Sequence, residues 1–172
     1  PIQRFAPPDL REEFLPLLAQ GRELAAFALT EPCAGSNPRA IESLALPDGG
    51  GWRLQGTKIW SGSASWSGFM NIFVKVGSRE GDVAGFAVPQ RTLGLRQGPE
   101  ALTMGMRGMV QNTIHLDDVP VGPAHLLGRL NEGMEVAQDA MMFARLVLGA
   151  MSLGGMKRCA QLMVRYASRR SV

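Results

Sequence analysis

The stretch from residue 25 to residue 37, AAFALTEPCAGSN, joins a short apolar run to a turn of small and polar residues. The run from Ala25 to Leu29 is long enough for a buried strand and too short for a helix. Pro32 ends the strand because proline cannot donate a hydrogen bond to a sheet. The small residues that follow allow the backbone to approach a ligand closely, and backbone N–H groups in such a turn can hold a phosphate or a flat heterocycle. An ordinary strand and turn is the alternative that this pattern leaves open.

A second stretch with related features runs from residue 54 to residue 64, LQGTKIWSGSA. An apolar strand pattern leads to Trp60, and Ser61, Gly62 and Ser63 follow it. An indole can stack on a flat ring system and exclude water from it. A backbone N–H or a hydroxyl beside such a ring can stabilise charge that develops on it. Taken alone, this stretch also fits a strand that ends in a turn of small residues.

Both stretches resemble signatures of the acyl-CoA dehydrogenase family, the flavoenzymes that oxidise acyl thioesters. The first signature corresponds to residues 27–36, FALTEPCAGS, and the second to residues 54–64. Further resemblances follow in the family's order, at residues 85–89 (GFAVP), 94–95 (GL), 104–108 (MGMRG), 114–121 (IHLDDVPV) and 128–133 (GRLNEG). Because these matches keep their order over nearly the whole chain, the chain is identified as a member of this family.

The resemblance implies FAD as the cofactor, held by eight residues of the two stretches: Phe27, Leu29, Thr30, Gly35, Ser36, Trp60, Ser61 and Gly62. The first three would line the isoalloxazine, the next two would lie at the pyrophosphate, and the last three would cover the other flank of the flavin. Ser36 would also lie near the acyl-CoA. The family usually has Ile-Thr-Asn after its tryptophan, so Gly62 offers only a backbone N–H where a threonine hydroxyl is usual. Asn37 stands where an aspartate is more usual.

Two arginines near the end of the chain match family positions. Arg145 matches an arginine that the family keeps near the active site, which implies a supporting or substrate-binding role, and Arg170 matches one that reaches the FAD of a neighbouring subunit. The planar guanidinium suits phosphate because it makes two hydrogen bonds at once. Most members carry the catalytic glutamate on a later segment, and a minority carry it where this chain has Ala144. Met142 replaces a usual aspartate, so we expect the base beyond Val172, or a relative that has given up dehydrogenation.

The sequence predicts a mainly β fold with flanking helices. Residues 1–24 would contain a helix capped by Asp9, and the resemblance implies that they are the tail of an N-terminal helical domain. Residues 25–129 would form an antiparallel β-barrel or sandwich, because Gly, Pro and Asp punctuate short apolar and β-branched runs. The resemblance implies that this domain binds flavin and acyl-CoA. Residues 130–172 would form one long helix, capped by Asn131, of a truncated helical bundle. The chain lacks an initiating Met and stops within this predicted helix, so we expect a fragment that is inactive alone.

The predicted strands of the β-domain cover residues 25–29, 41–46, 52–59, 69–76, 84–88 and 110–116. The PDGGG sequence at residues 47–51 predicts a hairpin turn between two of them. A Rossmann domain is not expected, because no GxGxxG follows a strand and strands do not alternate with helices.

Composition excludes several classes of function. The net charge of +3 is too small to favour nucleic acid. No apolar run reaches about 18 residues, so no membrane span is expected. Cys33 and Cys159 have no partner at a suitable spacing, so neither a metal site nor a disulfide framework is expected. Free thiols favour a reducing compartment, the cytoplasm or, in a eukaryote, the mitochondrial matrix.

The function implied by the resemblance is FAD-dependent α,β-dehydrogenation of an acyl-CoA thioester, as in fatty acid β-oxidation. In this family a carboxylate takes the α-proton while hydride leaves the β-carbon for flavin N5. The expected partners are the acyl-CoA, an electron-transfer flavoprotein or other acceptor, and further copies of the chain in a homodimer or homotetramer. One alternative is a flavin-dependent monooxygenase or oxidase of the same fold, which the altered residues 61–63 and Met142 keep open. The other is a non-catalytic scaffold, although packing alone would not require the TEPCAGS turn.

Overall fold

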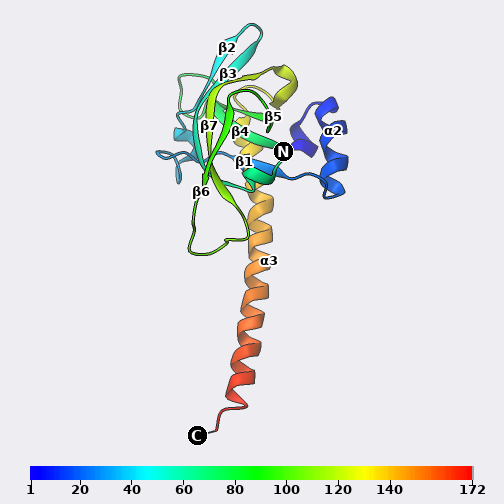
Figure 1. Ribbon diagram of the computed structural model, residues 1–172, viewed down its shortest axis with the longest axis vertical. Coiled ribbons are helices and arrows are strands. Elements are labelled where there is room, and N and C mark those ends of the chain that lie inside the picture. Colours follow the sequence, from blue (N-terminus) through cyan, green and yellow to red (C-terminus); the bar gives the residue numbers. More distant parts are fainter. Residues whose placement is uncertain (172) are drawn as a thin grey trace. The chain divides into compact units, whose positions relative to one another are not determined.

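The computed structural model describes residues 1–171, and the chain divides into two compact units, Pro1–Ala137 and Gln138–Val172. Figure 1 labels most of the helices and strands. The first unit begins with the helices α1 (Ile2–Phe5) and α2 (Pro8–Ala19). Its strands are β1 (Ala25–Ala28), β2 (Leu44–Asp48), β3 (Gly51–Gly62), β4 (Phe69–Lys75), β5 (Val83–Pro89), β6 (Leu95–Glu100), β7 (Gln111–Val121) and β8 (Leu126–Leu127). Its short 3₁₀ turns are η1 (Pro38–Ala40), η2 (Ala64–Trp66) and η3 (Pro123–His125).

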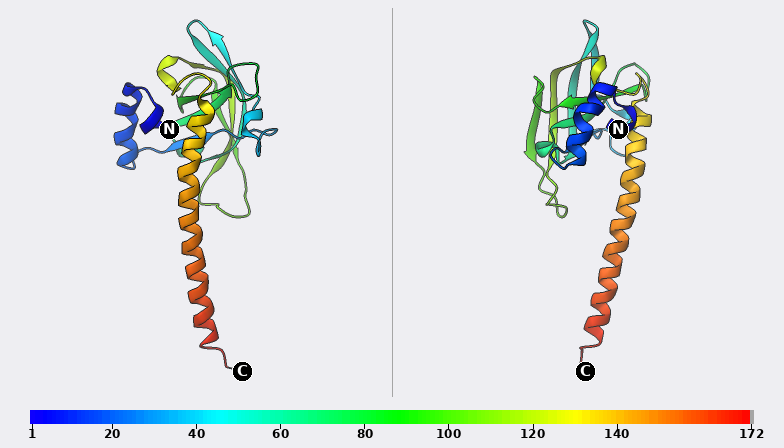
Figure 2. Two further views of the ribbon diagram at one scale, coloured as in Figure 1. Left: turned by 180° about the vertical axis from the view of Figure 1, so that it is seen from behind. Right: turned by 90° about the vertical axis from the view of Figure 1, so that its right-hand side faces the viewer.

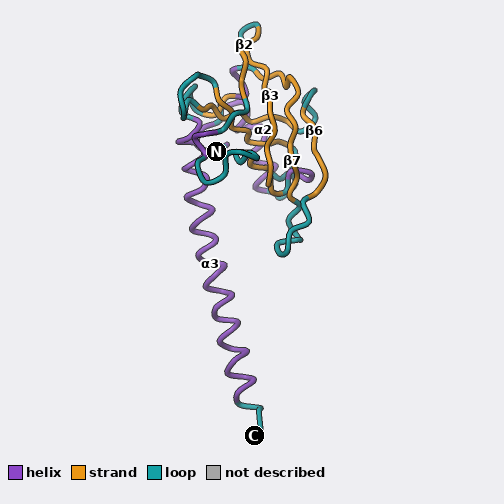
Figure 3. Tube along the Cα trace, turned by 90° about the vertical axis from the view of Figure 1, so that its left-hand side faces the viewer, coloured by secondary structure: helices purple, strands orange, loops and turns teal. Residues whose placement is uncertain are grey.

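The strands form one sheet in the order β6-β7-β3-β2-β4-β5-β8, with β1 paired to β4. Most pairs are antiparallel, including the long pair β3 and β7 that runs side by side in Figure 3. The predicted hairpin turn is confirmed, because Gly49 and Gly50 join β2 to β3 with φ of 54° and 94°, which suit a two-residue turn. β1 runs parallel to β4, and β2 pairs with β4 in the same sense at one position. The mainly β fold is therefore as expected, with these parallel pairs added.

Several local predictions were wrong. β2 starts at Leu44, three residues later than expected, and the strands β6 and β8 were not predicted. Asp9 lies in the first turn of α2, whose N-cap is Pro7. Asn131 does not cap the long helix, because it has a φ of 67° and the helix begins at Gly133.

The core of the first unit lies between the strands and is built from fully buried apolar side chains. Its larger members are Leu54, Met70, Ile72, Val74, Phe86, Val88, Ile114 and Val119. Figure 2 shows α1 and α2 next to each other beside the sheet. Phe14 of α2 packs on Phe69 of β4, with ring centroids 4.3 Å apart. This contact packs α2, the helix before β1, against the sheet.

The long helix α3 (Gly133–Ala167) begins in the first unit and makes up most of the second. Gly133, Met134, Val136 and Ala137 are buried at its start, and a Cβ at Gly133 would lie 2.6 Å from a backbone atom of Ala84, so only glycine fits there. From Phe143 to Ala167 every side chain is exposed. Leu146, Val147 and Leu148 are consecutive, so the apolar residues are not confined to one stripe.

By length and composition α3 could also cross a membrane, with a mean hydropathy of 1.3 over its most apolar window. The expectation that the chain has no membrane span did not anticipate such a helix. A single helix of this kind is weak evidence for a span, because helices inside globular proteins share its length and composition.

Candidate functional site

The structure brings the two suggestive stretches together at the end of β1. The backbone N–H of Ile59 donates to the carbonyl of Thr30 at 2.9 Å. The ammonium of Lys58 donates to the carbonyl of Leu29 at 3.2 Å. Two segments almost thirty residues apart in sequence are therefore joined by backbone and side-chain hydrogen bonds, and Trp60 directly follows Ile59.

A buried ion pair lies directly behind this junction. Lys58 Nζ contacts Glu31 Oε1 at 2.5 Å, and both side chains are inside the protein, with exposed fractions of 0% and 3%. The Glu31 carboxylate also accepts hydrogen bonds from the backbone N–H groups of Glu42 at 2.6 Å and Ser43 at 3.1 Å. Charged groups are almost never fully buried unless they are paired in this way.

The surroundings of this pair shift the pKa of both groups. Burial lowers the pKa of Lys58 to about 8, against the opposing attraction of Glu31. Burial also acts to raise the pKa of Glu31, but Lys58 and the N–H donors outweigh it and hold that pKa below its ordinary value. Near neutral pH the pair is therefore a carboxylate and an ammonium.

The side chain of Trp60 is turned outward by a bulge in β3. Lys58 pairs with Ile114 and Ser61 pairs with Asn112, so β3 has one more residue than β7 in this interval. Trp60 takes up the extra length with a φ of 58°, an uncommon value for an aromatic residue. Trp60 is 54% exposed, whereas Lys58 before it and Ser61 after it are fully buried. The bulge thus presents the indole at the surface next to the junction.

The turn after Pro32 is open on its outer side. Glu31 and Ala34 exchange backbone hydrogen bonds of 3.1 and 3.2 Å, which closes the turn. Gly35 and Ser36 are exposed, and a Cβ added at Gly35 would meet nothing within 4 Å. Asn37, the replacement for the usual aspartate, donates to Glu80 at 2.8 Å and accepts from the N–H of Arg39 at 3.2 Å. The open backbone leaves room for a ligand along the turn.

Cys33 lies in this turn, but its thiol is not activated. A hydrogen bond with Glu42 raises the pKa of the thiol above its usual range. The thiol therefore stays protonated at neutral pH and is a poor nucleophile.

Two of the predicted flavin residues pack into the protein instead of facing outward. Phe27 is half-buried and its ring lies 4.9 Å from that of Phe73. Leu29 is 5% exposed. Both side chains therefore support the segment that leads from β1 to Thr30, and their contact with a flavin stays a prediction.

Three further residues of the predicted site lie in different units, Gly62 in the first and Arg145 and Arg170 in the second. Gly62 lies against the side chain of Met109, whose sulfur would be 3.1 Å from an added Cβ. In the second unit Arg145 is exposed on α3, and Arg170 follows that helix and donates to the Tyr166 hydroxyl at 3.0 Å. Participation of these two arginines in the site stays a prediction.

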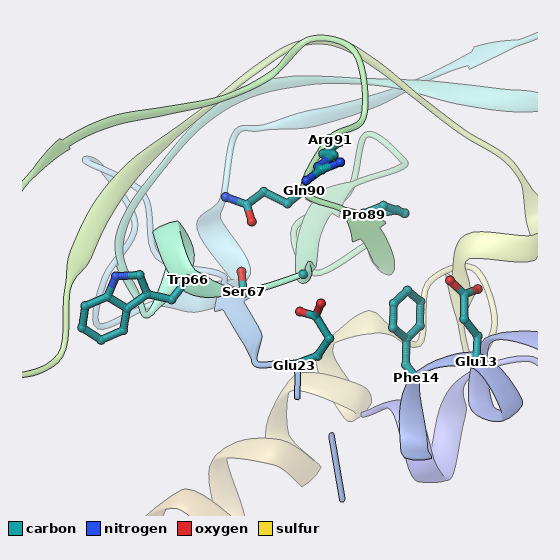
Figure 4. A pocket seen from close by; sticks show the side chains of 9 residues that line it. Glu13, Phe14, Glu23, Trp66, Ser67, Pro89, Gln90 and Arg91 are labelled. Atoms are coloured by element: carbon teal, nitrogen blue, oxygen red, sulfur yellow. The ribbon is translucent and has the colours of Figure 1, made fainter. Parts of the chain in front are cut away.

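Several cavities lie in the first unit. A small one, of about 100 Å³, is lined by Ile59, Trp60, Ala101, Asn112 and Thr113. Two others are larger. One, of about 280 Å³, adjoins the ion pair and is lined by Glu31, Pro32, Cys33, Glu42, Ser43, Gly56 and Thr57. The other, of about 390 Å³, is shown in Figure 4 between α2 and the ends of β4 and β5. Glu13, Glu23 and Arg91 are among its lining residues, and none of the predicted flavin residues lines it. The candidate site is therefore the junction of the two stretches and not this second cavity.

The sequence reading missed the ion pair. One signal could have revealed it: Leu54, Gly56 and Lys58 alternate along one strand, so the lysine shares a face with a core leucine. A lysine on a core face needs a buried acid, and Glu31 is the acid in the neighbouring stretch.

Comparison with known proteins identifies related chains. The middle domain of acyl-CoA dehydrogenases matches residues 26–119, and the C-terminal domain matches residues 131–172. The chain is 33% identical over 157 residues to cyclohexane-1-carbonyl-CoA dehydrogenase of Syntrophus aciditrophicus (strain SB), covering 90% of this chain and 41% of that protein.

Two solved structures extend this comparison. An acyl-CoA dehydrogenase complexed with FAD from Bacillus anthracis is 29% identical with a TM-score of 0.89, covering 98% of this chain and 30% of the other. The prolyl acyl carrier protein oxidase AnaB is 28% identical with a TM-score of 0.93, covering 98% of this chain and 45% of the other. The chain spans less than half the length of the curated relatives that it matches.

Proposed function

The chain belongs to the acyl-CoA dehydrogenase family, and we propose that it provides the flavin- and acyl-CoA-binding middle part of an enzyme that dehydrogenates an acyl thioester. The observation that carries this proposal is the junction of the two stretches at Thr30 and Ile59, with Trp60 turned outward beside it. Packing alone would not require an aromatic residue at positive φ on the surface of a strand.

Three features of the junction fit FAD as the cofactor. The exposed indole of Trp60 offers a flat apolar face for an isoalloxazine. The hydroxyl oxygen of Ser61 is buried and has no hydrogen-bond partner among the described residues, so it is available to a ligand polar group. The open backbone at Gly35 and the exposed Ser36 suit a pyrophosphate. When bound, FAD would supply the acceptor for the hydride, which carries two electrons away from the substrate.

The chain's own residues would bind and orient the reactants. Thr30 and Trp60 would hold the flat ring, Ser36 would contact the acyl-CoA, and the junction would keep water from the ring face. A carboxylate must take the α-proton, and Ala144 cannot do so. We therefore propose that the base comes from a part of the protein outside these residues and that Arg145 supports it.

The partners follow from the same proposal. Acyl-CoA would be the substrate, and an electron-transfer flavoprotein or another acceptor would reoxidise the enzyme. Arg170 would reach the FAD of a second copy in a homodimer or homotetramer.

An anaerobic titration tests the proposed function. The protein, expressed with whatever sequence flanks these residues in its genome, is purified with its flavin and mixed with a panel of acyl-CoAs. We expect the visible flavin absorbance to bleach with at least one acyl chain. A bound flavin that no acyl thioester reduces would contradict the dehydrogenase proposal, and a protein without flavin would favour the scaffold alternative.

An oxidase of the same fold is the second candidate. Gly62 lacks the threonine hydroxyl that is usual in the dehydrogenases, and AnaB, an oxidase, is a neighbour with a TM-score of 0.93. The same flavin-loaded protein distinguishes the two when air is admitted. An oxidase would turn over with oxygen and release hydrogen peroxide, whereas a dehydrogenase would need another electron acceptor.

A further inference from the structure

We propose that Lys58 and Glu31 are positioning residues for the flavin site, because their buried ion pair fixes the turn after β1 against β3. The inference rests on the proposed function, since it concerns the same site. Neither residue needs to touch the flavin. They act through the two segments that would hold it, the turn with Gly35 and Ser36 and the bulge with Trp60.

The contacts of the pair join three separate segments of the chain. Lys58 lies on β3 and donates both to the Leu29 carbonyl and to the Glu31 carboxylate, at 3.2 and 2.5 Å. Glu31 in turn accepts from the N–H groups of Glu42 and Ser43, which lead into β2. These are directional bonds from charged groups, so they set orientation as well as distance.

The backbone around the pair is shaped to allow these contacts. Gly56, two residues before Lys58, has a φ of 137°, and a Cβ there would lie 2.2 Å from Ser43 Oγ. Glycine therefore lets Ser43 approach β3 closely enough for its N–H to reach Glu31. On the other side of Lys58, the bulge at Trp60 starts at once. The ion pair thus anchors β3 two residues before Trp60, the residue whose orientation the flavin site requires.

Stability alone is a poor reason for such a pair. Burying two charges is costly, and well-packed apolar residues of similar size often replace a buried ion pair without loss of stability. The pair does what apolar packing cannot do, because hydrophobic contact is non-directional. It specifies one register between the two segments.

The test separates positioning from folding with three variants of the whole protein: Lys58→Met, Glu31→Gln and the double variant. FAD affinity is measured by equilibrium titration of the apoprotein, and the thermal midpoint is measured in parallel. We expect Lys58→Met to lower both, because it leaves the Glu31 carboxylate buried without its cation. The double variant, which has no buried charge, should regain most of the thermal midpoint while FAD affinity stays at least about tenfold below that of the wild type.

The exposed pair of Arg96 and Asp117 provides the matched control. It also joins two neighbouring strands, β6 and β7, but both side chains are 68% exposed. The double variant Arg96→Met/Asp117→Asn should keep FAD affinity within twofold of the wild type.

Recovery of FAD affinity in step with the thermal midpoint in the Lys58→Met/Glu31→Gln protein would overturn the positioning role. Wild-type apoprotein that binds no FAD would overturn the proposed function together with this inference. Wild-type binding with an unaffected double variant would overturn the inference alone.

Discussion

The two units differ in the burial of their apolar side chains. Up to Ala137 the large apolar side chains are mostly inside, and the charged pair Lys58–Glu31 is inside with them. From Phe143 to Ala167, the remainder of the helix, leucines, methionines, valines and aromatic residues are exposed. The first unit buries most of its own large apolar side chains, so its chemistry can be argued from its own contacts. The second unit exposes what a neighbouring surface would cover, so its role depends on residues beyond the helix itself.

The largest expected effect concerns the buried pair. Glu31→Ala removes the partner of Lys58 and the acceptor of two backbone N–H groups, so we expect a loss of about 3–5 kcal/mol in the free energy of unfolding. Urea denaturation of the two proteins measures it. Asp117→Ala, which breaks the exposed pair with Arg96, should cost less than about 1 kcal/mol. Equal losses would remove the distinction between buried and exposed pairs.

A second prediction concerns the exposed face of α3. If the protein covers this helix with further helices, Leu146→Ala should lower the free energy of unfolding by about 2 kcal/mol. Leu93→Ala is the control, because Leu93 is about as exposed as Leu146 (80% and 73%) but lies in the loop between β5 and β6 of the first unit. Leu93→Ala should change stability by less than about 0.5 kcal/mol. A result near zero for Leu146 as well would place α3 in solvent or in lipid.

The third prediction concerns acid. The pKa of Glu31 in the folded protein lies below its ordinary value of 4.5, so the unfolded chain takes up the proton first as pH falls. The stabilisation from Glu31 is therefore complete above about pH 4.5 and is lost as the pH falls through the folded pKa. Urea denaturation of the wild type and Glu31→Gln between pH 7 and pH 3 checks this. We expect the difference in stability to shrink toward acid, and a constant difference would contradict it.

Much of the fold was predictable because its signals are local. The apolar runs of β3, β4, β5 and β7 and the Gly49-Gly50 turn are visible in the sequence. β6 was missed because its sequence, LRQGPE, contains Gly98 and Pro99 and few apolar residues. β6 is a strand because it pairs with β7, and the sequence of residues 95–100 alone does not predict that pairing.

The site was predicted in part for the same reason. The family resemblance pointed to Thr30 and Trp60, and the structure brings their segments together. The outward orientation of Trp60 depends on a bulge, which is a property of two paired strands, and the partner of Lys58 lies 27 positions away. The orientation of Trp60 and the burial of Lys58 depend on contacts between residues far apart in sequence. The periodicity of a single strand does not predict such contacts.

The most direct test of the central claim, that the junction beside Trp60 is the flavin site, compares two tryptophans. Trp60 and Trp66 are both 54% exposed, and only Trp60 lies in the bulge beside Thr30. FAD affinity is measured by equilibrium titration of the apoproteins of Trp60→Ala and Trp66→Ala. Loss of a stacked ring costs about 0.5–1.5 kcal/mol, so we expect Trp60→Ala to bind FAD roughly 2- to 12-fold more weakly and Trp66→Ala to match the wild type. Equal affinities for the two variants, or a loss confined to Trp66→Ala, would contradict the claim.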